Sequence, residues 1–243
     1  MSVMTHAIAL SGGKDSTALA LRLAEVEPRP YVYLCTPTGN ELPEMVAHWA
    51  RLEELLGAPI LRLTEETLGE CIERNGMIPN WRARFCTRQL KIEPCLRWMA
   101  AHPDAVLYVG LRADEPDRPG IMGEEITCRF PLREWGWGIG EVWDYLRGRG
   151  VRIPRRTDCA LCFFQRIGEW RALLREHPEE WARGEAVEAR MGHTFRTPGK
   201  DRYPTALRDL RAHFEAEADA QPTLLEMEET ACQDYAPCRV CRI

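Results

Sequence analysis

A glycine-rich turn near the N-terminus has the composition of an anion-binding site. Residues 11–17 read Ser-Gly-Gly-Lys-Asp-Ser-Thr, between an apolar run at 7–10 and an apolar helical pattern from residue 18. Adjacent glycines let the backbone approach a phosphate closely, and the first N–H groups of the following helix would point at it. The hydroxyls and the lysine add donors and positive charge. We therefore predict a phosphate site formed by Ser11, Gly12, Gly13, Lys14, Asp15, Ser16 and Thr17.

Cysteines form a second candidate site. Residues 159–162 read Cys-Ala-Leu-Cys, a spacing that suits iron or zinc, with a redox pair as the alternative. Cys86 lies among four cationic residues, Arg82, Arg84, Arg88 and Lys91. Such charges would lower the pKa of its thiol, although a basic helix face with an incidental cysteine fits the same pattern. Three further cysteines near the C-terminus, Cys232, Cys238 and Cys241, would relay persulfide or electrons or bind a second metal.

Composition limits the class of protein. The chain has 243 residues, a formal charge of −5 and ten cysteines. The length suffices for a buried core, and the charge argues against a broadly basic nucleic-acid surface. Without a signal-peptide pattern or a membrane-length apolar run, we expect a cytoplasmic protein that does not enter the membrane, in which disulfides are disfavoured.

The elements that would position these residues alternate along the chain. Apolar runs at 7–10, 31–35, 58–63 and 105–110 predict strands, and the patterns at 18–26 and 44–56 predict helices, the second ending at Gly57. This alternation predicts an α/β fold with a doubly wound parallel sheet, whose ligands bind beyond the carboxyl ends of the strands. Helices expected at 167–175, 178–191 and 205–218 would form an α-helical C-terminal extension. We predict a nucleotide-binding and iron–sulfur domain at 1–170 and a helical extension with a cysteine-containing tail at 171–243.

Two charged segments are further candidates. After the strand at 105–110, Arg112 and Arg118 would contact phosphate or sulfate, and Asp114 and Glu115 would hold Mg²⁺, unless the segment is a solvated loop. The strongly basic run contains Arg147, Arg149, Arg152, Arg155 and Arg156. It would follow a nucleic-acid backbone or a polyphosphate, or remain a solvated loop without a partner.

Several of these motifs resemble a known family. Ser-Gly-Gly-Lys-Asp-Ser is similar to the pyrophosphate loop (PP-loop) of the ATP pyrophosphatases, the adenine nucleotide alpha-hydrolase-like superfamily. Thr38-Gly39 before Pro-Glu, Cys-Thr-x-x-Leu-Lys-x-x-Pro at 86–94 and Gly-Leu-Arg-x-x-Glu at 110–115 resemble its phosphoadenosine phosphosulfate (PAPS) reductase-like branch. The resemblance covers about residues 6–170. Pro37 and Pro116 depart from the pattern, which usually has Asp and Ser there.

The resemblance implies a Rossmann-like fold, a set of cofactors and roles for single residues. ATP would bind residues 11–17 with Thr38, Gly39, Arg112 and Arg118, Asp15 would help to hold Mg²⁺, and Lys14, Asp15 and Cys86 would be catalytic. Carried over by position, Cys86, Cys159 and Cys162 would ligate a [4Fe–4S] cluster. Cys128 is the candidate for the fourth ligand.

The function implied is that of an ATP-dependent iron–sulfur sulfurtransferase, resembling DNA phosphorothioation and tRNA thiolation proteins. It would adenylate a substrate such as nucleic acid, with a sulfur-donor protein as partner, and a homo-oligomer is compatible with the sequence. One alternative is an adenylyl sulfate (APS) or PAPS reductase. The intact loop and the absence of a Glu-Cys-Gly-Leu-His tail weigh against it. The other alternative is a non-catalytic ATP-binding subunit.

Overall fold

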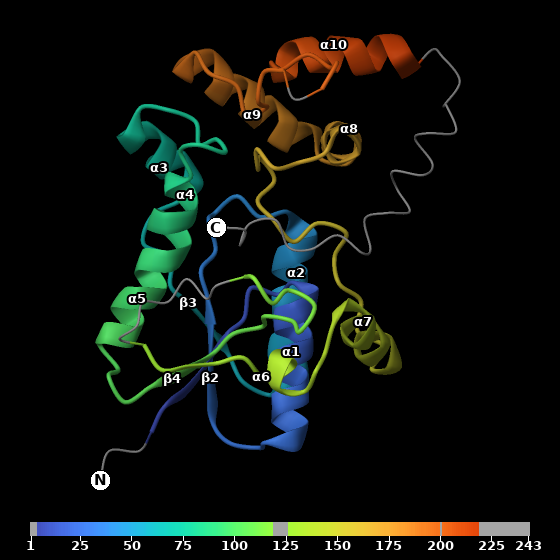
Figure 1. Cartoon of the computed structure of the whole chain (residues 1–243). Helices are drawn as coiled ribbons and strands as arrows, with labels where there is room; N and C mark the ends of the chain where they lie inside the picture. The colour runs from blue at the N-terminus through green and yellow to red at the C-terminus, as the bar shows by residue number, and fades with distance from the viewer. Residues whose placement is uncertain (1–3, 119–125, 200, 219–243) are drawn as a thin grey trace.

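A five-stranded parallel sheet forms the centre of the protein. The computed structural model describes residues 4–118, 126–199 and 201–218 (Figure 1). The strands are β1 (His6–Ala9), β2 (Tyr31–Cys35), β3 (Ile60–Arg62), β4 (Val106–Tyr108) and β5 (Cys128–Arg129). Their order is β3-β2-β1-β4-β5, with His6 of β1 in register with Tyr31 on one side and Val106 on the other. The predicted parallel α/β fold is confirmed, and β1 lies at the middle of the sheet.

Helices cover both faces of the sheet. The helices in the first two thirds of the chain are α1 (Lys14–Val26), α2 (Pro43–Leu56), α3 (Leu68–Asn75), α4 (Phe85–Thr87), the π-helical turn η1 (Arg88–Ile92), α5 (Glu93–Ala100), α6 (Pro131–Glu134) and α7 (Ile139–Gly148). One hydrophobic cluster joins the sheet to α1, α2 and α7 through Leu19, Trp49 and Val142. A smaller cluster packs α5 on the other face through Met99. The helices between 68 and 100 were not predicted from the sequence.

Local rules explain the helix ends that the sequence predicts. α2 ends at Gly57, which is left-handed with a φ of 62°, as expected for a C-terminal glycine. α1 begins at Lys14 rather than at residue 18, because Gly13 is its extended N-cap. The first turn of α1 therefore belongs to the predicted phosphate loop itself.

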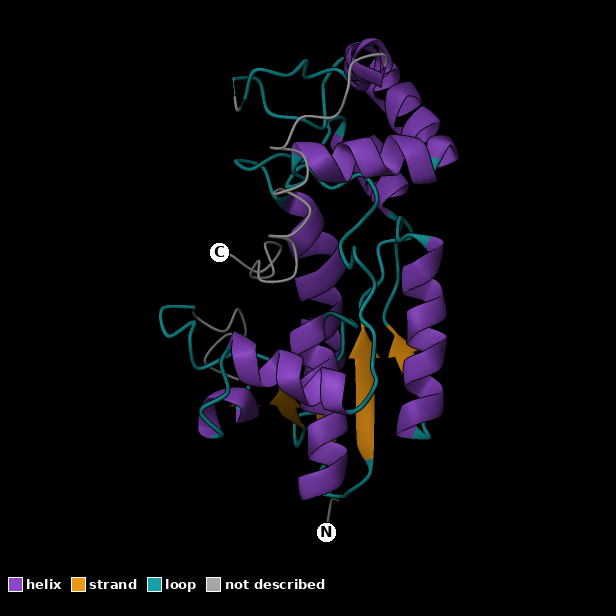
Figure 2. Ribbon diagram, turned by 90° about the vertical axis from the view of Figure 1, so that its right-hand side faces the viewer, coloured by secondary structure: helices purple, strands orange, loops and turns teal. Residues whose placement is uncertain are grey.

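A helical extension lies beyond the carboxyl ends of the strands (Figures 1 and 2). It consists of α8 (Ile167–Glu176), α9 (Pro178–Met191) and α10 (Leu207–Ala218), close to the three predicted helices. Trp170 and Trp181 are completely buried and meet edge to face at 6.0 Å. Their cluster also includes Leu42 and Leu161, so it crosses the boundary at 170. The division into 1–170 and 171–243 stays a prediction.

A buried carboxylate braces the extension internally. Glu188 of α9 is 8% exposed and accepts the backbone N–H groups of Phe195 (2.8 Å) and Leu207 (2.7 Å). It thereby holds the connection between α9 and α10. Burial raises the pKa of Glu188 to about 7, although the two N–H groups oppose this shift. Among the described residues, no helix is both long and apolar enough to span a membrane.

Candidate functional site

The glycine-rich turn follows β1 and is held by side chains from α2. Gly12 has a φ of 85°, and a Cβ there would lie 2.3 Å from Met45 Cε and 2.7 Å from Trp49 Nε1. Trp49 donates its indole N–H to the Ser11 carbonyl at 2.9 Å. The position therefore requires glycine both for its backbone conformation and for the space against α2.

Serine side chains brace the turn from within. The N–H of Gly13 donates to Ser11 Oγ (3.3 Å) and that of Gly12 donates to Ser16 Oγ (3.2 Å). Ser16 Oγ also donates to the Gly13 carbonyl at 3.1 Å. Thr17 is completely buried, so the structure withdraws it from the exposed surface of the loop. The remaining residues form a shaped turn at a helix N-terminus, the arrangement that binds phosphate.

A buried arginine connects this loop to the segment after β4. Arg112 is 3% exposed and its guanidinium meets Asp15 Oδ2 (3.0 Å), Asp114 Oδ1 (2.8 Å) and Glu115 Oε1 (3.3 Å). Burial opposes its charge, yet these carboxylates outweigh burial and raise the pKa of Arg112. Arg118 pairs with Glu115 at 3.0 Å. Both arginines thus pair with the chain's own carboxylates, and their predicted contacts with phosphate stay a prediction.

The Asp15 carboxylate offers an oxygen of the kind that binds a hydrated Mg²⁺ ion. Its Oδ2 accepts a hydrogen bond from Arg112 Nη1 and lies 3.7 Å from Lys14 Nζ. Its Oδ1 is buried and has no hydrogen-bond partner within the part of the chain that the structure describes. An unpartnered carboxylate oxygen beside a phosphate loop fits a magnesium-bound water. Lys14 and the loop N–H groups fit the phosphates of ATP.

The loop after β2 carries a link to the cysteines. Gly39 is left-handed with a φ of 68°, and a Cβ there would lie 2.7 Å from Thr67 Cγ2. Thr38 is 1% exposed; its hydroxyl donates to Glu41 Oε1 (2.7 Å) and lies 3.1 Å from Cys159 Sγ. Thr38 therefore contacts a thiol of the cysteine loop, and its predicted contact with the nucleotide stays a prediction.

Asn40 shapes the Cys-x-x-Cys loop. Its carbonyl accepts the N–H of Ala160 (2.6 Å), and its Oδ1 accepts the N–H of Leu161 (3.0 Å). Its Nδ2 donates to Glu180 of α9 at 3.3 Å. Asn40 thus ties the sheet to the cysteine loop and to the helical extension. Sequence reasoning missed this residue, because nothing local distinguishes it from an ordinary turn asparagine after Gly39.

Cys86, Cys159 and Cys162 form a chain of electrostatic neighbours. Burial raises the pKa of Cys86, with Cys159 adding to the shift and Lys91 opposing it. Burial also raises the pKa of Cys159, and it raises that of Cys162 to about 12. The predicted lowering of the Cys86 pKa is wrong. Burial dominates, and the charge of Arg88 is paired with Glu93 at 2.9 Å.

Cys128 is not brought to these three thiols. It lies on β5 and packs with Cys95 in the cluster between the sheet and α5, whereas Cys86 and Cys159 pack in another cluster. Its role as the fourth ligand stays a prediction. Across residues 4–118, 126–199 and 201–218, no three histidines, cysteines or acidic residues form a group that would hold a metal ion. Cys232, Cys238 and Cys241 lie outside the described residues.

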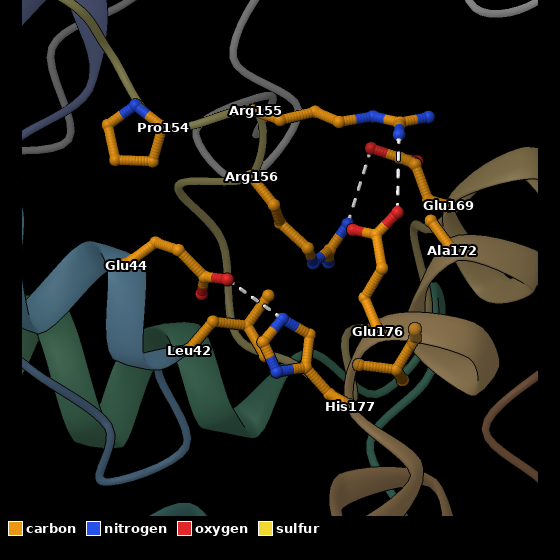
Figure 3. Close-up of a pocket in the computed structure, with 10 residues that line it drawn as sticks. Leu42, Glu44, Pro154, Arg155, Arg156, Glu169, Ala172, Glu176 and His177 are labelled. Carbon is orange, nitrogen blue, oxygen red and sulfur yellow. Dashed lines mark ion pairs between the residues drawn. The ribbon is translucent and has the colours of Figure 1, made fainter.

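The basic run is largely neutralised by the chain itself. Four of its five arginines form ion pairs: Arg147 with Asp144 (3.2 Å), Arg149 with Glu25 (2.5 Å), Arg155 with Glu176 (3.9 Å) and Arg156 with Glu169 (3.2 Å). The last two pairs line a cavity of about 80 Å³ between the start of α2, residues 154–156 and α8 (Figure 3). His177 and Glu44 close another side at 3.1 Å. The pairing weakens the case for nucleic acid binding along this run.

Comparisons with known proteins find a matching family model and a similar curated protein. The family model of the phosphoadenosine phosphosulfate reductase domain matches residues 5–172. A curated relative is sulfate adenylyltransferase subunit 2 of Streptomyces lavendulae, 28% identical over 230 residues that cover 79% of this chain and 68% of the relative.

Two solved structures are similar at lower identity. A phosphoadenylyl-sulfate reductase of Candida auris in complex with phosphate is 14% identical with a TM-score of 0.47, and the match covers 63% of this chain and 76% of the reductase. An NH3-dependent NAD synthetase of Campylobacter jejuni in complex with nitrate is 12% identical with a TM-score of 0.42, and the match covers 92% of this chain and 90% of the synthetase. Their TM-scores are too low to support an inference about function.

Proposed function

The chain belongs to the phosphoadenosine phosphosulfate reductase domain family, and on this premise we propose that it transfers the adenylyl group of ATP to an acceptor. The observation that carries the proposal is the braced turn at 11–17, with Lys14 at its helix N-terminus and the unpartnered Oδ1 of Asp15 beside it. An acceptor oxygen would attack the α-phosphorus. The bond from that phosphorus to the bridging oxygen would break, and pyrophosphate would leave with the electron pair.

The chain's own groups would act on the charge of the departing pyrophosphate. The N–H groups at the start of α1 and the ammonium of Lys14 would stabilise this charge. Asp15 would hold Mg²⁺, which neutralises phosphate charge when it is bound. Arg112 would act indirectly, because its 3.0 Å contact holds Oδ2 of Asp15 and so orients the other oxygen.

The finer proposal is sulfur transfer to the adenylated acceptor. Thr38 and Asn40 join the loop after β2 to the cysteine loop. Both candidate sites therefore depend on loops at the carboxyl ends of neighbouring strands. Sulfur at the level of hydrosulfide would attack the activated centre and displace AMP, without net oxidation or reduction. The raised pKa values of Cys86, Cys159 and Cys162 disfavour a free thiolate at these three positions at neutral pH.

Metal binding by Cys86, Cys159 and Cys162 remains part of this proposal. A bound iron or zinc ion replaces the thiol proton, and burial then no longer opposes the charge on sulfur. As placed, the three side chains do not form a complete ligand group in the described regions. The reaction steps proposed above involve no [4Fe–4S] cluster.

A second candidate acceptor is sulfate. It is favoured by the relative named sulfate adenylyltransferase subunit 2, whose similarity covers 79% of this chain. In that reaction the same loop would hold ATP, and the product would be adenylyl sulfate. A partner subunit would then be expected.

The test separates the products formed from α-labelled ATP with Mg²⁺. Parallel tubes contain sulfate, or hydrosulfide with tRNA or DNA. AMP and pyrophosphate formed only with nucleic acid and hydrosulfide support sulfur transfer, whereas labelled adenylyl sulfate supports the second candidate. Lys14→Ala should lower either rate about 100-fold, while Arg51→Ala, which removes an exposed ion pair with Glu54 on α2, should leave it unchanged. Intact ATP with every acceptor would contradict the proposal, and APS and PAPS would then be tested as substrates of a reductase.

A further inference from the structure

We propose that the segment from Trp81 to Arg88, which joins α3 to η1, is a binding surface for single-stranded nucleic acid (Figure 1). The Trp81 indole would stack on one base, and Arg82 and Arg88 would contact phosphates. This inference rests on the proposed sulfur transfer and names the class of acceptor. The cations around Cys86 do not lower the pKa of that thiol, so their concentration there has another explanation.

The segment is strongly cationic within an acidic chain. Between Glu73 and Glu93 lie five cationic residues and no carboxylate, whereas the whole chain has a formal charge of −5. The five are Arg74, Arg82, Arg84, Arg88 and Lys91. Arg88 pairs with the flanking Glu93 at 2.9 Å, and its side chain is 77% exposed. Such an exposed pair contributes little to stability, so a phosphate can replace the carboxylate.

Trp81 presents an open aromatic ring on this segment. Among the residues that the structure describes, it is the only exposed tryptophan, tyrosine or phenylalanine, at 54%. The Arg82 guanidinium lies 4.7 Å from the centroid of its ring. Since an indole has two faces, a base can stack on the face opposite the guanidinium, which at the same time favours a phosphate nearby. A base linked to a phosphate therefore matches both side chains at once.

The turn that carries Trp81 is held in place by its neighbours. The Asn80 side chain accepts the N–H groups of Arg82 (2.9 Å) and Ala83 (3.0 Å) at Oδ1, and the Asn80 N–H donates to the Ala83 carbonyl at 3.2 Å. Ile78 is 2% exposed and anchors the start of the connection in the cluster that includes the helical extension. A base would thus meet a surface that is already formed, which lowers the entropy lost on binding.

The same segment borders the candidate sulfur site. The Arg84 guanidinium lies 4.9 Å from the ring centroid of Phe164, which follows Cys162 by two residues. Trp81 precedes Cys86 by five residues, so their Cα atoms are at most about 18 Å apart. A strand bound from the indole to the start of η1 would pass the helical turn that carries Cys86. The surface would thereby bring the acceptor to the thiols.

Fluorescence anisotropy tests the inference on the full chain, at low salt and without ATP, with labelled oligouridylate and oligothymidylate of about 12 nucleotides. Trp81→Ala should weaken both about tenfold through the loss of one stacked base, and Trp81→Phe, which keeps a ring, should recover most of this affinity. Inorganic polyphosphate carries charge without bases, so Trp81→Ala should bind it as the wild type does. Arg82→Ala should weaken all three ligands and reduce the slope of log K against log salt concentration by about 0.7.

Arg202→Ala is the matched control and should leave every affinity unchanged. Arg202 is also exposed and stacks on the aromatic residue beside it, Tyr203 at 5.4 Å, but it lies in the helical extension. Tighter binding of oligouridylate or of oligothymidylate would identify the acceptor as RNA or DNA, and either result supports the inference.

Two results would overturn the inference. One is wild-type affinity for both oligonucleotides in Trp81→Ala, and the other is a parallel loss of polyphosphate binding in that variant. Failure of the proposed function is distinguishable from both, because oligonucleotide binding is measured without ATP. The proposed function fails instead if no acceptor leads to release of pyrophosphate from ATP.

Discussion

Glu188 should make the stability of the protein fall as the pH rises through neutrality. Both of its oxygens accept backbone N–H groups, which favours the ionised carboxyl, whereas burial favours the neutral one. Burial is the larger effect and raises the pKa from 4.5 to about 7. Nearby Glu185 adds to the shift and Arg196 opposes it.

The magnitude follows from the two pKa values. Ionising Glu188 in the folded state costs up to about 3 kcal/mol, at about 1.4 kcal/mol for each unit between 4.5 and about 7. The folded state holds this proton more tightly than the unfolded state. Its contribution is therefore fully present below pH 4.5 and is lost as the pH rises through about 7.

Urea denaturation of wild type and Glu188→Gln at about pH 5 and about pH 8 measures the effect. The amide keeps one acceptor but presents N–H donors to the second backbone N–H, so the variant should be less stable at pH 5 by about 1–3 kcal/mol. By pH 8 the difference should shrink or reverse. Hydrogen exchange at the amides of Phe195 and Leu207 reports the same brace locally. Glu54→Gln, which removes an exposed carboxyl of α2 paired with an arginine, is the control and should leave the pH dependence unchanged.

The sign of the change is the critical result. If the advantage of the wild type over Glu188→Gln grows between pH 5 and pH 8, then the two backbone N–H bonds outweigh burial. The raised pKa would then be wrong. A difference that does not vary with pH would show that Glu188 keeps one protonation state across this range, and it would refute the reasoning in the same way.

Three further changes test the site. Gly12→Ala should lower the free energy of unfolding by about 1–3 kcal/mol and weaken ATP binding, because the added methyl would lie 2.3 Å from Met45 Cε and the backbone is left-handed. An unchanged melting temperature and ATP affinity would contradict this. Arg112→Met should lower the free energy of unfolding, measured with denaturant, by about 3–5 kcal/mol, because three carboxylates lose the cation that they share. An unchanged free energy would show that these carboxylates do not depend on Arg112. Asn40→Ala should lower the free energy of unfolding by about 1–3 kcal/mol and speed the chemical labelling of the thiols at 159–162, because the Leu161 N–H loses its acceptor. Unaltered labelling would show that Asn40 does not hold the cysteine loop.

Features set by neighbouring residues were predictable from the sequence. The turn at 11–17, the strand before it and the end of α2 at Gly57 follow from local backbone rules. The parallel sheet follows from the alternation of strands and helices. The π-helical turn at 88–92 has no such signal, and the short strand β5 has only two residues.

Features that depend on distant partners were not predictable. The sequence shows Arg112 as a candidate anion ligand, but only the fold brings Asp15 to within 3.0 Å of it. It shows a basic cluster around Cys86, but burial decides the sign of the pKa shift. Cys128 has the right chemistry for a metal ligand, and its strand carries it to a different cluster. In each case charge or residue type was clear, whereas spatial neighbours and burial were not.

The strand order also sets when the site is completed as the chain is synthesised. β1 emerges early, yet its hydrogen-bonding neighbours are β2 on one side and β4, ending at Tyr108, on the other. The turn that follows β1 meets Arg112, the partner of Asp15, only after β4 has been synthesised. At about 5–20 residues per second, the nascent turn spends seconds without its partners. We therefore expect ATP to stabilise only chains translated well beyond β5, which ends at Arg129, so that nucleotide binding would report on completed synthesis of the sheet.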